Sequence, residues 1–355
     1  MTDVFSLFRP LIHALPPEAV HNAGLFALRH HLLPAARRQP DALLARNIFG
    51  LHFKSPLGLA AGFDKNAVAL DALLMQGFGF VEAGTVTPKP QPGNPKPRIF
   101  RLKEDEAVIN RLGFNNGGLE PYVRRFSARA KALGIAGANI GKNKDASDAV
   151  ADYVTGLTAV YPYADYVTVN ISSPNTQGLR ALQEKEALTA LLAALASARA
   201  ECKAQYERNV PMLLKVAPDL TQQDREDIVE VVLAHGIDGM IINNTTIARP
   251  DSLQSAYKGE QGGLSGKPLL EMANDNLMQF YRLTGGKIPL IGVGGIASAE
   301  DAYRKIRAGA SLVQLYTALV YQGFAVVGRI NQGLSELLRR DGFTHISQAT
   351  GVDAQ

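Results

Sequence analysis

The feature that most constrains the fold is a repeated alternation of short apolar runs with longer amphipathic stretches, beginning near Ser55. Such alternation is typical of βα units, in which buried parallel strands are separated by helices. Eight strands that are each followed by a helix close into a barrel, so we expect a (β/α)8 barrel, the TIM-barrel fold. The eight runs lie at residues 57–61, 80–86, 135–140, 166–171, 212–216, 239–243, 289–293 and 312–316.

Helix-start signals agree with this division. Thr221 with Asp224, and Ser298 with Asp301, have the spacing of a capping box, in which the first residue caps the helix and the acidic residue bonds back. An open doubly wound sheet is the alternative architecture, but the glycine fingerprint usual after its first strand is missing. The sequence therefore favours the closed barrel.

Two segments interrupt the alternation. Residues 87–118 contain PKPQPGNPKPRIFRL and NRLGFNNGG, and a loop of this length in a compact domain usually has a function. Residues 245–268 include the glycine-rich stretch GEQGGLSGKP, which we expect to form a lid over the barrel mouth.

The first forty residues differ in kind from the rest. Apolar residues recur at helical spacing in two groups separated by Pro16 and Pro17, and Pro10 argues against one long uninterrupted helix. We therefore divide the chain into a helical hairpin, residues 1–40, and a barrel, residues 41–355. The apolar face of the hairpin suits a membrane surface, and it equally suits packing on the barrel. Basic residues Arg9, Arg29, Arg37 and Arg38 outnumber acidic Asp3 and Glu18 in this region.

Composition excludes several classes of protein. The net charge is +4 and the charges alternate in sign without a basic block, so we expect no nucleic-acid partner. A pI near 9.0 mildly favours contact with an anionic surface or an acidic ligand. The single cysteine, Cys202, fits a reducing compartment, and we expect it to be inert. The longest apolar run, residues 187–200, falls short of a membrane span.

Polar residues end nearly every predicted strand. Catalytic groups of a parallel barrel project from the carboxyl ends of its strands, so these residues are site candidates. Buried amides and lysines are costly unless their hydrogen bonds are satisfied, and a planar ligand rich in heteroatoms would satisfy them. Capping of a helix or loop explains any one of them alone, but not the whole ring. The ring consists of Lys65, Thr85, Asn139, Asn170, Lys215, Asn243, Asn244, Tyr316 and Thr317.

The last two strands lead into IGVGGIAS and LYTALV, and loops at these positions form the phosphate site common to such barrels. Lys215 is suited to stabilising the anionic reduced ring of a flavin, although an ion pair inside the barrel is the alternative. A phosphate-binding aldolase or isomerase without flavin remains a rival, with Lys65 or Lys215 as its Schiff-base lysine. A non-enzymatic scaffold on a membrane is a further rival, but it would predict loss of the polar strand ends.

Ten motifs in order give the chain a specific resemblance that covers nearly its whole length. They are AAGFDKN, EAGTVTPKPQPGNPKPR, NRLGFNN, NIGKNK, NISSPNTQGLR, KVAPDL, NNTT, GGLSG, GVGGI and LYT. With these motifs the chain resembles the dihydroorotate dehydrogenases. The resemblance implies an FMN site at Ala61, Gly62, Thr85, Asn139, Asn170, Lys215, Asn243, Gly266, Gly295, Tyr316 and Thr317. It implies a dihydroorotate site at Lys65, Asn110, Arg111, Leu112, Gly113, Phe114, Asn170, Asn175, Asn244 and Thr245.

The same resemblance assigns the chemistry. Ser173 would be the general base that removes the C5 proton while a hydride passes from C6 to flavin N5, with Thr176 or a water relaying the serine proton. The family's soluble branch has a cysteine here, so Ser173 favours the membrane-associated branch, which reduces a quinone. That branch has an amino-terminal helical extension like the hairpin, which implies that His21 and Arg101 line the quinone entrance. Asn243 departs from the threonine that the branch often has.

The function implied is FMN-dependent oxidation of dihydroorotate to orotate with a quinone as acceptor, in pyrimidine biosynthesis. We expect a monomer with no metal, bound peripherally to the cytoplasmic side of the inner membrane. The alternative of a soluble-branch enzyme using fumarate or NAD is disfavoured by Ser173 and by the hairpin.

Overall fold

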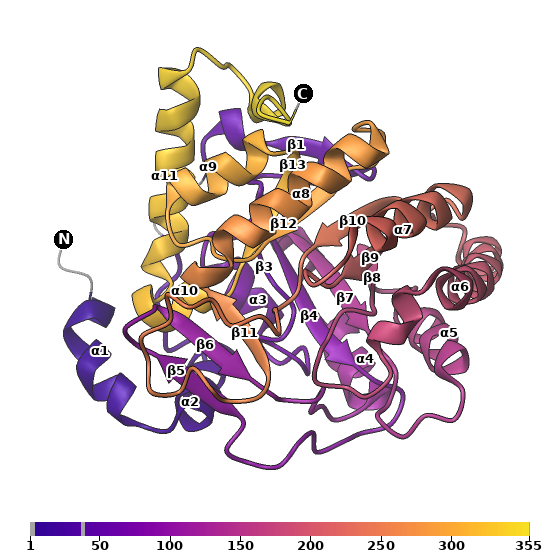
Figure 1. The fold of residues 1–355 in the computed structure, drawn as a ribbon, viewed down its shortest axis with the longest axis horizontal. Coiled ribbons are helices and arrows are strands. Elements are labelled where there is room, and N and C mark those ends of the chain that lie inside the picture. Colours follow the sequence, from indigo (N-terminus) through magenta and orange to yellow (C-terminus); the bar gives the residue numbers. More distant parts are fainter. Residues whose placement is uncertain (1–3, 37–39, 355) are drawn as a thin grey trace.

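A computed structural model describes residues 4–36 and 40–354, and the eight predicted strands form a closed barrel (Figure 1). Every neighbouring pair in the barrel is parallel, as βα units require. Each predicted run matches its strand to within two residues at either end. The strands are β3 (Leu57–Leu59), β4 (Phe80–Val86), β7 (Ile135–Ile140), β8 (Tyr166–Asn170), β9 (Met212–Val216), β10 (Gly239–Ile242), β12 (Leu290–Val293) and β13 (Ala310–Leu315).

Helices surround the barrel, and the two predicted capping boxes are present at Thr221 and Ser298. The helices are α3 (Leu70–Leu74), α4 (Leu119–Ser127), α5 (Ala149–Val160), α6 (Lys185–Tyr206), α7 (Gln222–Ala234), α8 (Leu270–Thr284), α9 (Ala299–Arg307), α10 (Thr317–Gln322) and α11 (Ala325–Arg340). Short 3-10 turns are η1 (Ala42–Leu44), η2 (Lys131–Leu133), η3 (Arg180–Gln183), η4 (Lys267–Leu269) and η5 (Ile346–Ala349). Cys202 is buried in α6 with a free thiol, in the outer helix where it was expected.

Large side chains fill the amino-terminal end of the barrel. The antiparallel pair β1 (Arg46–Ile48) and β2 (Leu51–Phe53) brings Phe53 against Phe80, with ring centroids 5.3 Å apart. Gly58 leaves room for the Phe80 ring, because a Cβ on this glycine would lie 2.4 Å from it. This end is therefore a packed core, and the opposite end is left to carry polar groups.

The two interrupting segments pair with each other, which corrects their interpretation as a long loop and a separate lid. β5 (Ile99–Leu102) and β6 (Ala107–Asn110) come from the first segment, and β11 (Gly263–Gly266) from the second. Together they form a three-stranded antiparallel sheet beside the barrel mouth (Figure 1). The apolar residues of these strands form a separate buried cluster. In β5 and β6 they stand at every second position, which is the spacing of a strand with one buried face.

The predicted hairpin consists of α1 (Val4–Ala14) and α2 (Pro17–Arg29), and the chain breaks between them at the proline pair. The first forty residues do not form one long helix, as expected, but Pro10 lies inside α1 and is not where the chain breaks. A proline removes one backbone donor, and the remaining hydrogen bonds of this eleven-residue helix are sufficient to keep it continuous. Asp3, Arg37 and Arg38 lie outside the described residues.

The two hairpin helices differ in how their apolar faces are covered. Leu28 of α2 is buried against the barrel, and Arg98 donates twice to Glu18 of α2, at 2.6 and 3.2 Å. By contrast α1 leaves Leu7 and Leu11 72% and 65% exposed. The apolar face of α2 is thus packed on the barrel, whereas α1 contacts α10 and leaves Leu7 and Leu11 as an uncovered apolar face. Among the described helices, none has the length and hydropathy needed to span a bilayer.

Candidate active site

A chain of hydrogen bonds joins polar side chains from several strands at the carboxyl-terminal rim of the barrel. The Asn170 amide donates to the Thr85 hydroxyl at 2.8 Å, and that hydroxyl donates to Asn139 Oδ1 at 2.5 Å. Asn139 in turn donates to Glu82 Oε1 at 2.7 Å. The structure therefore brings together three of the predicted ring residues, from β4, β7 and β8.

The same chain continues to the sixth strand. Asn244, just after β10, donates to Ser172 Oγ at 2.8 Å, and Ser172 donates to Asn170 Oδ1 at 2.6 Å. Thr245 bonds back to Asn244 through its backbone N–H. Because fixed partners on both sides orient these amides, Asn170 lies at the centre of a connected polar surface.

Glu82 is the hub that the sequence interpretation missed. It is fully buried, and it also accepts from the Tyr166 hydroxyl and from Gln314 Nε2, each at 3.0 Å. Its signal was visible as a single carboxylate within the apolar run FVEAGTV. A charged residue in a buried strand implies partners, and here they include the Asn139 amide that belongs to the predicted site.

Two buried groups at this rim lack the partners that such groups normally have. Both side-chain amide atoms of Asn243 are buried without a hydrogen bond to any described residue. Lys215, paired in register with Asn170, is also buried, and no hydrogen bond from its ammonium is found within the described chain. Burial lowers the pKa of Lys215, and the Glu82 carboxylate opposes that shift. Unpaired buried amides and ammonium groups are rare in finished interiors, so this rim is built to meet a polar ligand.

Glycines open the predicted phosphate side of the rim. A Cβ on Gly295 would lie 2.5 Å from Leu270, and one on Gly266 would lie 2.4 Å from the Glu106 carbonyl. Both glycines have positive φ, 80° and 100°. Thr317, at the start of α10, donates to Ser265 Oγ at 2.9 Å, which links the loop after β13 to β11. Backbone N–H groups in such turns and at helix starts are suited to a phosphate.

The loop after β3 carries Lys65 and the small residues Ala61 and Gly62. The Lys65 ammonium donates to the Gly62 carbonyl at 2.7 Å. Burial lowers the pKa of Lys65 to about 8, and the nearby Arg98 charge adds to that shift. The loop is fixed by buried Asp64, which accepts from two backbone N–H groups of the following turn. The Lys65 ammonium is thus held at the barrel mouth, where it is available to an anionic ligand.

Ser173 is buried directly after β8, and its Oγ accepts from the Asn175 backbone N–H at 3.2 Å. The Asn175 amide donates to the backbone carbonyl of Asn110 at 3.1 Å, so these two predicted substrate residues meet across the mouth. The Thr176 hydroxyl is buried with no hydrogen bond to any described residue, so the structure does not join it to Ser173.

The segment from Arg111 to Phe114 borders this region with mixed orientation. Arg111 reaches away to Glu260, 2.7 Å from its carboxylate, and stacks over Phe100. Phe114 is buried with a positive φ of 52°, and the Leu112 and Gly113 carbonyls are bonded within the loop, to Asn94 and Gln91. Of these four residues, only Phe114 has a buried ring near the hydrogen-bonded side chains of the rim. Its ring and the Thr85 side chain both lie against Gly141.

An aromatic path leads from the hairpin to the rim. His21 of α2 packs edge-on against Phe63 with ring centroids 5.1 Å apart, and Phe63 packs edge-on against Tyr316 at 5.5 Å. Burial lowers the pKa of His21 to about 4, and the Lys65 charge adds to this, so the imidazole is neutral near pH 7. Arg101 of β5 donates to the carbonyls of Ile12 and Leu15 in the hairpin.

Known proteins match this chain along almost its full length. The family model described as dihydroorotate dehydrogenase matches residues 43–338. A protein named dihydroorotate dehydrogenase (quinone) from Parvibaculum lavamentivorans is 55% identical over 352 residues, 99% of each chain. One of the same name from Azorhizobium caulinodans is 52% identical over 353 residues, again 99% of each.

Solved structures agree. A DHODH from Eimeria tenella in complex with ferulenol has a TM-score of 0.92 and 40% identity, covering 97% of this chain and 99% of that one. The ligand-free form from the same organism has a TM-score of 0.91 and 43% identity, covering 96% and 99%.

Proposed function

The chain belongs to the dihydroorotate dehydrogenase family, and from that premise we propose that it oxidises dihydroorotate to orotate and reduces a quinone. The observation that carries the proposal is the rim itself. A connected chain of buried polar side chains runs through Asn170, which is in register with the buried Lys215, and the Asn243 amide is buried there without a hydrogen bond to any described residue. We place the reaction in pyrimidine biosynthesis.

The family is flavin-dependent, and we propose FMN as the flavin of this chain. The unpaired Asn243 amide and the buried Lys215 ammonium fit a ring rich in carbonyls and ring nitrogens. The phosphate would lie at the glycine turns, where added side chains would collide with backbone. When bound, FMN supplies the acceptor for a hydride and the donor of two electrons to a quinone. The residues proposed to hold it are Ala61, Gly62, Thr85, Asn139, Asn170, Lys215, Asn243, Gly266, Gly295, Tyr316 and Thr317.

Lys65 would neutralise the carboxylate of dihydroorotate, because its ammonium is already held at the mouth by a backbone carbonyl. Asn175 and Asn110, joined to each other, would present amide donors and acceptors to the pyrimidine ring. The proposed substrate residues are Lys65, Asn110, Arg111, Leu112, Gly113, Phe114, Asn170, Asn175, Asn244 and Thr245, with Arg111 contributing through its backbone since its side chain is committed to Glu260.

Ser173 would remove the C5 proton of the substrate. A serine hydroxyl is a weak base in water, and its burial next to the Asn175 N–H keeps bulk water from competing for the oxygen. A water molecule is then the simpler relay for the serine proton, because Thr176 is not bonded to Ser173 in this structure.

The quinone would approach along the hairpin, past His21 and Arg101. The neutral His21 ring and the aromatic contacts through Phe63 to Tyr316 form an apolar route toward the proposed flavin. We assign residues 1–40 to membrane contact and 41–355 to catalysis, in a monomer bound peripherally at the cytoplasmic face of the inner membrane. The exposed apolar side chains of α1 support that contact.

An anaerobic visible spectrum tests the proposal in two steps. Dihydroorotate should bleach the purified yellow protein, and a quinone added afterwards should restore the colour. A colourless protein, or a yellow one that dihydroorotate does not bleach, would refute the function. Bleaching that fumarate or NAD reverses in place of a quinone would refute the choice of acceptor.

A further inference from the structure

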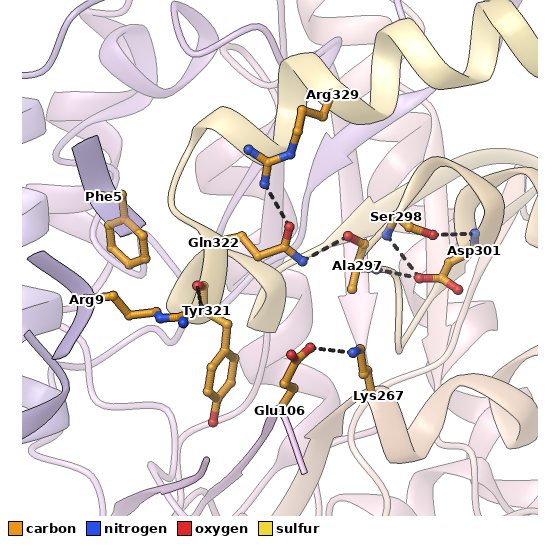
Figure 2. A pocket seen from close by; sticks show the side chains of 10 residues that line it. All are labelled: Phe5, Arg9, Glu106, Lys267, Ala297, Ser298, Asp301, Tyr321, Gln322 and Arg329. Atoms are coloured by element: carbon orange, nitrogen blue, oxygen red, sulfur yellow. Dashed lines mark hydrogen bonds and ion pairs between the residues drawn. The ribbon is translucent and has the colours of Figure 1, made fainter. Parts of the chain in front are cut away.

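Two arginines outside the set of proposed reaction residues are bonded in different ways. In the hollow of about 670 Å³ beside α1, Arg329 of α11 donates to Gln322 of α10 at 2.8 Å, and these two helices follow each other in the chain (Figure 2). Arg180, the first residue of η3, instead bonds to three loops that follow three different strands of the barrel. Arg180 therefore connects parts of the rim that the chain itself keeps apart.

The guanidinium of Arg180 donates through each of its nitrogens. Nε donates to the Ser172 carbonyl and Nη2 to the Thr245 carbonyl, both at 3.0 Å. Nη1 donates to Asp219 Oδ2 at 2.8 Å. A planar guanidinium has five N–H groups in fixed directions, so it can hold three acceptors at once in a defined arrangement.

The two backbone acceptors lie in the loops that the proposed reaction uses. The Ser172 carbonyl belongs to the peptide bond that precedes Ser173, the proposed base. Because a peptide unit is planar, a bond to this carbonyl fixes the plane from which Ser173 continues. The Thr245 carbonyl lies in the loop that carries the proposed substrate residues Asn244 and Thr245. Arg180 thus contacts both the side of the base and the side of the substrate.

The barrel strands do not pair these two loops directly. β8 and β10 are not neighbours, because β9 lies between them and pairs with both. Their loops are joined instead by side chains, through Arg180 and through the bond from Asn244 to Ser172 Oγ at 2.8 Å. Ser172 is therefore held on its hydroxyl by Asn244 and on its carbonyl by Arg180.

Asp219, in the loop after β9, keeps Arg180 in place. Its Oδ2 accepts from Arg180 and from the Ile247 N–H at 3.3 Å, and its Oδ1 accepts from the Thr246 hydroxyl. The side chains of Arg180 and Asp219 are 21% and 16% exposed, so the pair is partly shielded from water. Loss of either partner should loosen the three loops relative to one another.

We propose that Arg180 is a positioning residue for the oxidation of dihydroorotate, because it holds the loop of Ser173 against the loop that binds the substrate. It acts through the Ser172 and Thr245 carbonyls, which place the Ser173 hydroxyl within reach of the C5 proton. The inference rests on the proposed function, in which Ser173 is the base. A displacement of about 1 Å between reacting groups can slow a reaction about 100-fold.

Arg180→Lys tests the proposal, because it keeps the positive charge beside Asp219 and removes the planar fork of donors. In the FMN-loaded protein, flavin reduction by dihydroorotate should slow about 100-fold in anaerobic stopped-flow measurements, and reoxidation by a quinone should keep its rate. Substrates deuterated at C5 or at C6 identify the affected step. The isotope effect at C5 should increase relative to that at C6, because the C5 proton transfer becomes slower.

Orotate binding, measured by calorimetry, separates position from affinity. Orotate binds without a proton transfer, so its affinity for Arg180→Lys should fall less than about tenfold, the contribution of roughly one hydrogen bond. A loss of orotate affinity as large as the loss of rate would overturn the proposal, because Arg180 would then act on binding.

Asp219→Asn is a second variant that leaves Arg180 unchanged. An asparagine has one acceptor oxygen, whereas Asp219 accepts through both of its oxygens. Flavin reduction should slow about tenfold, as expected for the loss of one hydrogen bond, and the isotope effect at C5 should again increase.

Arg199→Lys is the matched control. Arg199 of α6 also pairs with a carboxylate, Asp238 at 2.6 Å, and donates to a backbone carbonyl, Gly236 at 3.3 Å, but both acceptors precede β10, at the opposite end of the barrel. This variant should keep the unmodified rate and isotope effects. An unmodified rate in Arg180→Lys would overturn the proposal. So would a slower rate with unchanged isotope effects, since Arg180 would then serve only the stability of the fold.

The unmodified protein distinguishes this inference from the proposed function. If dihydroorotate does not bleach it, the proposed function is refuted and the role of Arg180 with it. If the unmodified protein and Arg180→Lys are bleached at the same rate, only the role of Arg180 is refuted.

Discussion

The barrel rim and helix α1 leave opposite kinds of group unsatisfied. At the rim, the Asn243 side-chain amide is buried without a hydrogen bond to any described residue, and the Lys215 ammonium is buried with only the Glu82 carboxylate as an opposing charge. On α1, Leu7 and Leu11 are apolar groups exposed to water. Each arrangement is unfavourable in isolation, the first because desolvated polar groups need hydrogen bonds and the second because apolar surface favours burial.

The difference indicates what kind of partner each region needs. A buried polar surface is completed by a small ligand whose atoms match it one by one. An exposed apolar surface is completed by a medium, since a non-directional driving force needs only area. Variants of the rim should therefore change binding, chemistry or folding, and variants of α1 should change where the protein resides.

The largest effect is expected from Ser173→Ala. Loss of the proposed base should slow flavin reduction by dihydroorotate about 10²- to 10⁴-fold, while bound flavin and its reoxidation by quinone persist. Anaerobic stopped-flow absorbance measures both half-reactions. Ser127→Ala, in α4, is the control and should react at the unmodified rate. Undiminished flavin reduction in the Ser173 variant would remove the base from the mechanism.

Glu82→Gln tests whether the rim depends on its buried hub. It removes the carboxylate that opposes the buried Lys215 charge and that accepts from Asn139. Leaving a buried cation without its opposite charge costs about 3 kcal/mol, and urea unfolding should report a decrease of that size. Glu230→Gln breaks the exposed pair with Lys185 and should change the free energy of unfolding by less than about 1 kcal/mol. Equal stabilities would mean that Glu82 is not a structural centre.

Leu11→Glu tests the hairpin side of the comparison. Leu11 is exposed, so the free energy of unfolding should move by no more than about 0.5 kcal/mol. Affinity for vesicles should fall about tenfold, because burying one leucine contributes about 1.5 kcal/mol or more. Reduction of a long-chain quinone in vesicles should fall with it, and reduction of a short-chain quinone should not. Leu133→Glu, an exposed leucine in η2, should behave like the unmodified protein.

Lys305 gives the smallest effect and sharpens the contrast within the barrel. This fully buried lysine of α9 has a partner, Asn274 Oδ1 at 2.8 Å, and so needs no ligand. Burial lowers its pKa to about 7, against 10.5 for an exposed lysine. Between these values the unfolded chain binds more protons than the folded one, so the lysine makes the free energy of unfolding rise with pH.

That rise should be about 1 kcal/mol between pH 7 and pH 8. Urea unfolding at pH 7 and at pH 8 measures the rise, and in Lys305→Met the contribution of this lysine to it should be absent. Lys203→Met, an exposed lysine on α6, should keep the full rise. A pH dependence identical in all three proteins would contradict the assigned titration.

The sequence predicted the eight barrel strands well because parallel strands buried on both faces appear as short, nearly continuous apolar runs. It also placed Asn139 and Asn170 at the rim, since the carboxyl ends of parallel strands face the same way. The hub at Glu82 was missed because its partners lie on β7, β8 and β13, and one strand alone does not reveal them.

The sheet of β5, β6 and β11 was missed for a related reason. Its strands have four residues each, and β11 pairs with β6 across more than 150 positions of chain. Glycine and proline in these segments indicated loops, and non-local pairing overrode that local preference. The sequence did not show that α1 continues through Pro10, because contacts with α10 stabilise this helix despite the missing donor.

The bond from Arg101 to the hairpin has a consequence for substitutions in α1. Its guanidinium holds the carbonyls of Ile12 and Leu15, which every amino acid at those positions would supply. The barrel thereby recognises the shape of the α1 backbone at its end and is indifferent to the identity of the outward side chains. Substitutions at Leu11 or Leu15 should therefore alter the proposed membrane contact and leave the attachment of the helix in place, because Arg101 bonds only to backbone carbonyls.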